Sequence, residues 1–284
     1  MNGFYSLWTK PSAGGAGREF AMQDHELACL LLSVAAYEEC NGRTRLYADK
    51  KAGAFFMERG LEDIFSRGMV EFEVPEDIDP NVFWAAGKLC ALKLEDMPSV
   101  MIDTDLIIWR SIGRHLRDKS VAVIHREELN PAIYPDPGTF PVKNGYSYPK
   151  GWDFNIRPAN TAMLYIRDKD FRDHYVKESL RFMQNLGPSQ DNLCPMVFAE
   201  QRILPMCAAE RGLSVYAFCP SMEGLREQDM FTHIWGHKNV FKFNMDERRG
   251  FVRRCMLRLK REFPEMYKKA AHIPELAEYA ADEE

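Results

Sequence analysis

Apolar residues along this chain occur either in short runs bounded by glycine, proline or charged residues, as in strands, or at helical spacing between capping residues and glycine stops. The short runs predict strands at residues 4–8, 45–48, 99–102, 120–124, 160–166 and 213–218. The longer stretches predict helices at residues 23–40, 50–59, 81–94, 169–184, 190–209 and 246–261. We expect Pro205 to kink the fifth helix, because proline cannot donate the helical hydrogen bond. Strands and helices that alternate in this order predict a doubly wound α/β sheet flanked by helices.

Three stretches depart from this pattern. Residues 70–79 are acidic and predict an edge strand with a loop. Residues 130–152 predict a long insertion loop, whose many prolines and aromatic rings distinguish it from a disordered segment. The rings have two interpretations, a binding loop or an irregular loop pinned to the body of the protein. We expect a single domain whose acidic end, residues 263–284, is a frayed tail.

Composition excludes several classes of protein. The chain of 284 residues is 46% hydrophobic and 28% charged, as globular proteins are, and its net charge of −5 disfavours nucleic acid as a partner. Its seven cysteines form no Cys-x-x-Cys motif, which disfavours a zinc site or disulfide framework and favours reduced thiols in the cytoplasm. No apolar run reaches the roughly 18 residues that cross a bilayer, and the first residues lack a signal-peptide pattern. Neither a Walker A loop nor a Gly-x-Gly-x-x-Gly motif is present.

The first candidate for chemistry is the pair Asp103 and Asp105, which directly follows the apolar run at 99–102. In an extended chain, positions i and i+2 point to the same side, so the two carboxylates face one way. Ligands of α/β sheets bind at the carboxyl ends of strands, and hard divalent cations take oxygen ligands. An isolated Asp-x-Asp is usually a turn or a cap. Here apolar segments flank the pair on both sides, and buried charges are rarely left unpaired, so we expect a cation.

Four features in order resemble GT-A fold glycosyltransferases: the Asp-x-Asp after a strand, a later strand led by Asn160, the helical pair Glu200-Gln201, and a His-x-x-Gly-x-Lys motif at 233–238. The order is most similar to the glycogenin-like and bacterial lipopolysaccharide galactosyltransferase-like enzymes. The chain also resembles an uncharacterised bacterial group assigned to glycosyltransferases, which opens with a Trp-Thr/Ser-Lys-Pro strand end. The resemblance implies a GT-A-like mixed sheet, with a nucleotide-binding half at 1–110 and an acceptor-side half at 111–262. It implies a metal-dependent enzyme that moves a sugar from a nucleotide-sugar to a glycan or other hydroxyl acceptor. The expected donor is a UDP-sugar.

The resemblance also implies a metal site for Mn²⁺ or Mg²⁺. Its ligands would be Asp103, Asp105 and His233, a mixture of carboxylates and imidazole that suits Mn²⁺ better than Ca²⁺. His237 lies within reach of the same role. Lys238 would bind the diphosphate, although it follows the glycine by two residues where the related enzymes have three. Thr104, between the two aspartates, would contact the ribose.

The nucleotide base would lie at the ends of the first two strands. Candidates there are Trp8, Thr9, Lys10, Tyr47 and Asp49. Asp49 has an equally good alternative role as the cap of the helix that begins at residue 50. On the helix before the metal motif, Lys88 would approach the donor sugar or diphosphate, or it is a solvated helix lysine.

The reaction centre would be the pair Glu200 and Gln201, with Asn160 and Asp191 lining the same pocket. In the retaining enzymes the acid of this pair is aspartate and holds the donor sugar, while the glutamine lies under the anomeric carbon. Glutamate here shifts the carboxylate by one methylene, so Glu200 has a second interpretation as the general base of an inverting enzyme. A second functional class also stays open, a catalytically silent binding or assembly protein with the same fold.

The last predicted helix carries a run of arginines and lysines. One interpretation is a solvated face balanced by the acidic tail. The other is peripheral contact with an anionic membrane surface or a lipid-linked acceptor.

Overall fold

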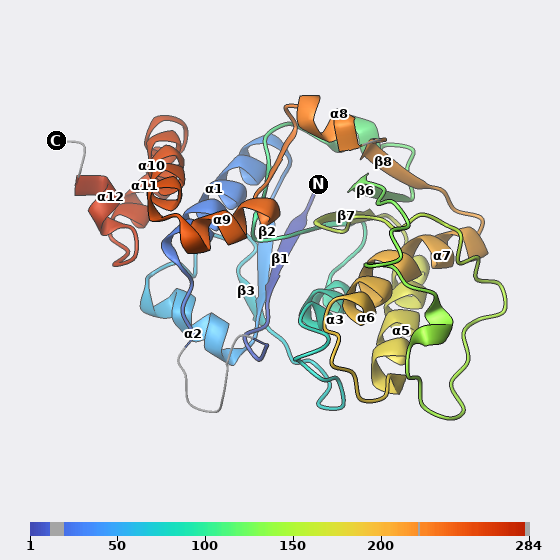
Figure 1. Cartoon of the computed structure of the whole chain (residues 1–284). Coiled ribbons are helices and arrows are strands. Elements are labelled where there is room, and N and C mark those ends of the chain that lie inside the picture. Colours follow the sequence, from blue (N-terminus) through green and yellow to red (C-terminus); the bar gives the residue numbers. More distant parts are fainter. Residues whose placement is uncertain (12–19, 221, 282–284) are drawn as a thin grey trace.

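The computed structural model describes residues 1–11, 20–220 and 222–281, which form a mixed α/β fold (Figure 1). A seven-stranded sheet has the order β3-β2-β1-β4-β7-β6-β8, and a two-stranded sheet pairs β5 with β9. The strands are β1 Gly3–Leu7, β2 Thr44–Ala48, β3 Met69–Glu71, β4 Ser99–Ile102, β5 Leu106–Ile108, β6 Val121–His125, β7 Met163–Ile166, β8 Val215–Cys219 and β9 Phe231–His233. The predicted mixed sheet flanked by helices is confirmed.

The helices occupy the connections between these strands. The α-helices are α1 Asp24–Cys40, α2 Lys50–Glu58, α3 Ala86–Leu94, α4 Gly113–Leu116, α5 Lys169–Asn185, α6 Cys194–Val197, α7 Ile203–Glu210, α8 Met222–Glu227, α9 Lys238–Phe243, α10 Met245–Glu262, α11 Pro264–Ala271 and α12 Ala277–Ala281. Short 3₁₀ turns cover Pro137–Thr139 and Trp235–His237, and a π-helical segment covers Phe198–Arg202. No helix in the described part of the chain is long and apolar enough to cross a membrane.

Strand direction explains why the sheet is mixed. Strands β3, β2, β1 and β4 run parallel, whereas β7 is antiparallel to both of its neighbours, β4 and β6, and β8 is parallel to β6. The carboxyl ends of β1 and β4 therefore lie side by side at one edge of the sheet. In α/β sheets this edge is where ligands bind.

Side-chain alternation along each strand divides the interior into two cores. Along β1, Phe4 joins the core under α3, α5 and α7, while Tyr5 joins the core under α1 and α10. Along β4, Met101 and Val100 divide in the same way. Successive residues of a strand point to opposite faces, so two helical layers cover the sheet, one on each side (Figure 1).

Two sequence-based expectations are corrected by the structure, and one apolar segment without a predicted element is a strand. The C-terminal residues 263–281 are not a frayed tail, because α11 and α12 bury Ile273, Leu276 and Tyr279 against the body. The predicted helix at 81–94 begins only at Ala86. The apolar segment after Asp105 is a further strand, β5, whose partner β9 comes from the other end of the chain.

The long loop at 130–152 is held by aromatic packing. The rings of Phe140 and Tyr148 lie against Phe182 of α5 and Phe198, with centroids 5.1–6.4 Å apart. Trp152 is also buried. These contacts support the interpretation that most of the rings pin the loop to the body.

Candidate active site

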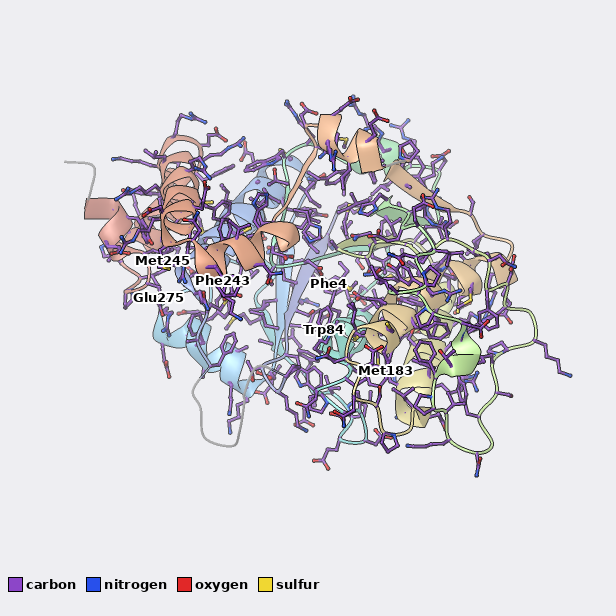
Figure 2. The ribbon with its side chains drawn as sticks, viewed as in Figure 1. Phe4, Trp84, Met183, Phe243, Met245 and Glu275 are labelled. Atoms are coloured by element: carbon purple, nitrogen blue, oxygen red, sulfur yellow. The ribbon has the colours of Figure 1, made fainter. Side chains whose placement is uncertain are left out.

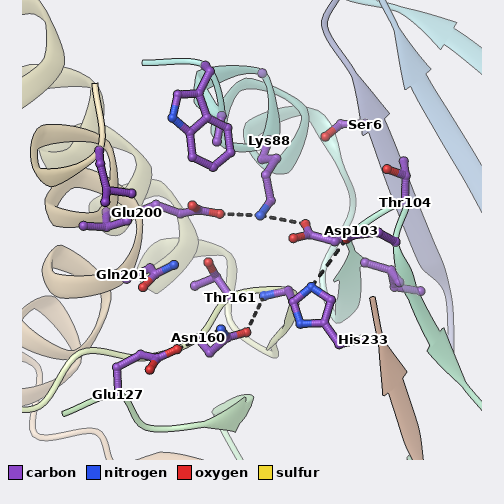
Figure 3. Close-up of a pocket in the computed structure, with 18 of the residues that line it drawn as sticks. Ser6, Lys88, Asp103, Thr104, Glu127, Asn160, Thr161, Glu200, Gln201 and His233 are labelled. Carbon is purple, nitrogen blue, oxygen red and sulfur yellow. Dashed lines mark hydrogen bonds and ion pairs between the residues drawn. The ribbon is translucent and has the colours of Figure 1, made fainter. Parts of the chain in front are cut away.

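The three candidate metal ligands converge at the carboxyl end of β4. Asp103 and Asp105 follow that strand, and the β5–β9 ladder pairs Leu106 directly with His233. The backbone N–H of Ile234 also donates to the Asp105 carbonyl at 3.0 Å. As a result, one ligand atom from each of the two aspartates and His233 lies within 4.8 Å of the others. Figure 3 shows Asp103 and His233 on the same side of the pocket. The expected convergence of these three side chains is observed.

The charge of this cluster fits a divalent cation. Burial raises the pKa of Asp103 to about 6; Lys88 opposes this shift, and the negative charges of Asp105 and Glu200 add to it. His233 places Nε2 3.5 Å from Asp105 Oδ1. Two carboxylates and an imidazole are ligands that Mn²⁺ accepts readily. The residues present therefore match the donor set that such an ion requires.

Lys88 links the cluster to the neighbouring helix layer. Helix α3 approaches the end of β1 so closely that a Cβ at Gly87 would lie 2.6 Å from the Trp8 Cβ. This approach carries the Lys88 ammonium to 2.6 Å from Asp103 Oδ1 and into an ion pair with Glu200 (Figure 3). Although burial acts to lower it, the two carboxylates hold the pKa of Lys88 above its usual value. The interpretation as a solvated helix lysine is therefore wrong.

Glu200 and Gln201 lie on the π-helical segment, which interrupts the helix predicted at 190–209. Pro205 has no N–H to offer the Gln201 carbonyl, which instead accepts from the Ala159 N–H at 2.9 Å. The Glu200 carbonyl accepts from the Tyr175 hydroxyl at 2.6 Å. Side chains and a neighbouring segment thus satisfy backbone groups that a regular helix would pair internally. Such π-bulges occur frequently at functional sites.

The cavity wall opposite Lys88 is polar, and its residues lie just before β7 and just after β6. Asn160 donates from Nδ2 to Glu127 Oε1 at 3.0 Å, and its Oδ1 accepts from the Ala162 N–H at 3.2 Å. The Tyr134 hydroxyl donates to Gln201 Oε1 at 2.6 Å. Sequence reasoning missed Glu127, because it lies in an irregular segment where spacing carries no signal. Tyr134 belongs to the aromatic loop at 130–152, for which a binding role is one of the two interpretations.

All of these groups face one cavity of about 630 Å³. The predicted site residues that line it are Trp8, Lys88, Asp103, Thr104, Asp105, Asn160, Glu200, Gln201 and His233. Lining residues that the sequence did not single out include Ser6, Trp84, Glu127, Tyr134, Thr161 and Leu193. The site is therefore assembled from both halves of the chain.

The expected base-binding residues divide into two groups. Thr9, Lys10 and Asp49 line a smaller cavity of about 360 Å³ that shares Trp8 with the first. Asp49 caps α2, since Oδ1 accepts from the Ala52 N–H at 3.0 Å, and its Oδ2 accepts from the Thr9 N–H and hydroxyl at 2.7 and 2.8 Å. This geometry supports the cap interpretation.

Tyr47 lines neither cavity. It is 1% exposed, and its ring packs edge-on against Phe4 and Phe72 in the core. Its hydroxyl donates to the buried carboxylate of Glu95 at 3.3 Å. Tyr47 is therefore a core residue and not a surface on which a base can stack.

Asp191 and His237, two further candidates for this site, do not line the cavity. Asp191 is exposed and accepts through Oδ1 from the N–H groups of Leu193 and Cys194, so it caps the turn that begins α6. His237 stacks on Phe241 at 5.9 Å between centroids and is not part of the candidate metal cluster. Lys238 begins α9, and its side chain lies outside the described side chains.

The basic residues of α10 are partly engaged in the described structure. Arg248 donates from Nε to Asp24 at 2.5 Å, and Arg258 lies over the Trp109 ring at 3.6 Å and pairs with Glu262. These contacts place part of the arginine run against the body of the protein. Contact with a membrane surface stays a prediction.

Several solved structures have a similar fold. A galactosyltransferase, LgtC, in complex with donor and acceptor sugar analogues is 14% identical, with 89% of this chain and 95% of that chain covered and a TM-score of 0.45. The PaToxG glycosyltransferase is 12% identical, with coverages of 89% and 77% and a TM-score of 0.40. The 4-diphosphocytidyl-2C-methyl-D-erythritol synthase of Anaerococcus prevotii is 12% identical, with coverages of 76% and 85% and a TM-score of 0.35.

Similarity at this level concerns the fold alone, so the chemistry of the site is argued from its own residues. No curated protein matches the chain. Residues 1–273 match a family described as a family of unknown function (DUF6734), and the chain belongs to that family.

Proposed function

We propose that this protein is a metal-dependent glycosyltransferase that moves a sugar from a nucleotide-sugar, a UDP-sugar, to a hydroxyl group of a glycan or other acceptor. The observation that carries the proposal is the convergence of Asp103, Asp105 and His233 in the same cavity as Glu200 and Gln201. A metal-ligand set and a polar pair beside it are the two parts that such a transfer requires. The cavity of about 630 Å³ falls within the range of roughly 300–1,000 Å³ usual for small-molecule sites.

The charges of the site suit a departing nucleoside diphosphate. A Mn²⁺ or Mg²⁺ ion held by Asp103, Asp105 and His233 would neutralise the negative charge that develops on the diphosphate. The Lys88 ammonium adds a second positive charge beside Asp103. Thr104 and Trp8 line the cavity near this cluster and are our candidates for contacts with the nucleoside. Lys10 lines the smaller cavity next to Trp8, where it can meet a further phosphate or the base.

The reaction centre is assigned to Gln201 and Glu200. The Tyr134 hydroxyl donates to Gln201 Oε1, and within the described residues the Nε2 group has no hydrogen-bond partner, so it can donate into the cavity. Glu200 is 2% exposed and paired with Lys88, so it lacks the unpaired, accessible carboxylate that an inverting general base needs. For this reason we favour retention of configuration, with Glu200 holding Lys88 in place beside the donor sugar.

One observation favours the alternative of a silent binding protein. The Lys88 ammonium bridges Asp103 and Glu200, so these charges already satisfy one another without a ligand. A protein of this kind would bind a nucleotide-sugar and release it unchanged. Turnover, and not binding, separates the two functions.

The proposal is tested with the purified chain and a panel of UDP-, GDP- and dTDP-sugars, with and without Mn²⁺. A ligand that binds only the native state raises the melting temperature, so we expect a shift for a UDP-sugar that requires Mn²⁺. Release of UDP from that sugar, by slow hydrolysis or transfer, would identify an enzyme. The matched control is Asp118→Asn, which removes an exposed carboxylate outside the cavity. Absence of any Mn²⁺-dependent shift would contradict the proposal, and a shift without UDP release would favour the silent protein.

A further inference from the structure

An apolar shelf lines the mouth of the cavity. It consists of Trp84, Ile133 and Leu193, which come from the segment before α3, the long loop and the segment before α6. Trp84 and Leu193 are 46% and 44% exposed, and both belong to the few large apolar side chains that the described surface leaves open. Single exposed apolar residues are normal, but a group around a cavity marks a site of contact.

The shelf is held in place by hydrogen bonds between its segments. The Trp84 indole N–H donates to the Asn192 carbonyl at 3.0 Å, beside Leu193. The Cys194 thiol donates to the Ala132 carbonyl at 3.5 Å, beside Ile133. Figure 2 labels Trp84 close to the ribbon of α3. The ring therefore presents a fixed flat surface to anything that enters the cavity.

Glu127 supplies a hydrogen-bonding group in the same cavity. Its Oε1 accepts from Asn160 Nδ2 at 3.0 Å and lies 3.6 Å from His125 Nε2. Within the described part of the chain, Oε2 has no hydrogen-bond partner, and the side chain is 24% exposed. An ionised carboxylate accepts about four hydrogen bonds, so Glu127 retains capacity for ligand hydroxyls. Glu200, by contrast, is engaged with Lys88.

We propose that the shelf and Glu127 form an acceptor subsite that binds a neutral glycan, an inference that rests on the proposed function. A pyranose ring has an apolar face of C–H groups and a rim of hydroxyls. In a neutral glycan, the apolar face of one ring contacts the shelf, and hydroxyl groups of the glycan donate to Glu127, which lines the same cavity. The carboxylate of Glu127 itself repels an anionic acceptor, whereas Glu128, which also lines the cavity, is paired with Arg157. A purely apolar ligand would cover Glu127 without satisfying it, at a cost in free energy.

The test measures glycan binding by the full chain on an array of neutral and sialylated oligosaccharides, with UDP and Mn²⁺ present. We expect the wild type to bind neutral glycans, and Trp84→Ala and Glu127→Gln each to weaken that binding by about tenfold, as the loss of an aromatic contact or a charged hydrogen bond implies. Trp84→Phe keeps a flat aromatic ring and should retain most of the glycan binding. The matched control is Leu257→Ala, which truncates a side chain of α10 that is 51% exposed and lies outside the cavity. Melting temperatures of all variants establish that each is folded.

The outcomes separate this inference from the proposed function, which calorimetry of UDP with Mn²⁺ tests independently. UDP binding without any glycan binding would overturn the acceptor subsite and leave the proposed function standing. Equal glycan binding by wild type and Trp84→Ala, or a preference for sialylated glycans, would also overturn the subsite. Glycan binding that depends on Trp84 in a protein without UDP binding would support the subsite and contradict the proposed function.

Discussion

Replacing Lys88 with methionine removes the central positive charge of the cavity. Methionine has a similar length and a similar helix propensity, so α3 itself is preserved. The lost contacts are the 2.6 Å ion pair with Asp103 and the ion pair with Glu200, whose side chain is 2% exposed. The substitution leaves two neighbouring carboxylates without their shared partner.

The size of the effect follows from the burial of these groups. Removal of one partner from a buried ion pair costs roughly 3–5 kcal/mol of folding free energy. Because the Asp103 side chain is 24% exposed, water recovers part of the loss, and we expect about 3 kcal/mol, the lower end. At roughly 2–4 °C per kcal/mol for chains of about this size, the melting temperature should fall by about 6–12 °C.

The loss should also depend on pH. The pKa of Asp103 is already raised to about 6 in the native protein, and loss of Lys88 raises it further. A carboxyl group whose folded pKa exceeds its unfolded value loses stability as pH rises through the interval between the two. The gap between wild type and Lys88→Met should therefore be small at pH 5 and widest at pH 8.

The assay is urea and thermal unfolding followed by circular dichroism at pH 5 and pH 8, first without metal. The control is Lys93→Met, which removes an exposed lysine from the same helix. Addition of Mn²⁺ should restore part of the lost stability, because the ion gives the carboxylates a new partner. A loss below about 0.5 kcal/mol at pH 8, the usual range for surface substitutions, would refute the reasoning, as would an equal loss in Lys93→Met.

Three further predictions follow from the same structure. Asp103→Asn should abolish Mn²⁺-dependent binding of UDP, because it removes one of few hard ligands; calorimetry that returns the wild-type affinity would contradict this. Gln201→Ala should lower kcat much more than it weakens donor binding, since groups that act in the transition state affect turnover; unchanged UDP release would remove Gln201 from the reaction centre. Asp24→Asn should cost about 2 kcal/mol at pH 7, because Asp24 accepts from Arg248 and Tyr279. Burial acts to raise the pKa of Asp24, but hydrogen bonds from His25, Tyr279 and Arg248 hold it below its usual value. The stability difference between wild type and Asp24→Asn should therefore shrink as pH falls below about 4. If urea titrations find the same difference at pH 3 and pH 7, the ionised carboxylate is not the source of the stability.

The sequence alone located the parts of the site that follow regular elements. The apolar run of β4 predicted a buried strand, and the alternation of side chains along it predicted that Asp103 and Asp105 point together. Glu200 and Gln201 were located on a helix by the same kind of local pattern, and both line the cavity. The positions of these residues could be predicted because burial and periodicity are properties of neighbouring residues.

Local pattern did not decide between roles that depend on distant partners. From the sequence, Asp49 can contact the nucleotide base or cap the following helix. In the structure its carboxylate accepts hydrogen bonds from the N–H groups of Ala52 and Thr9, which supports the cap. Tyr47 has an aromatic ring that could stack on a base, yet it lies in the core. A polar or aromatic side chain has the same sequence signature whether it faces a ligand or another part of the chain.

Long-range pairing determined the rest of the site. The ladder between β5 and β9 places His233 beside Asp105 although more than a hundred residues separate them along the chain. Glu127 and Trp84 reach the cavity from irregular segments, which lack the periodicity on which sequence reasoning depends. The sequence by itself therefore determined the elements and the residues at their ends. Only the tertiary structure decided which of those ends meet, because strand pairing and packing are interactions between residues far apart in the chain.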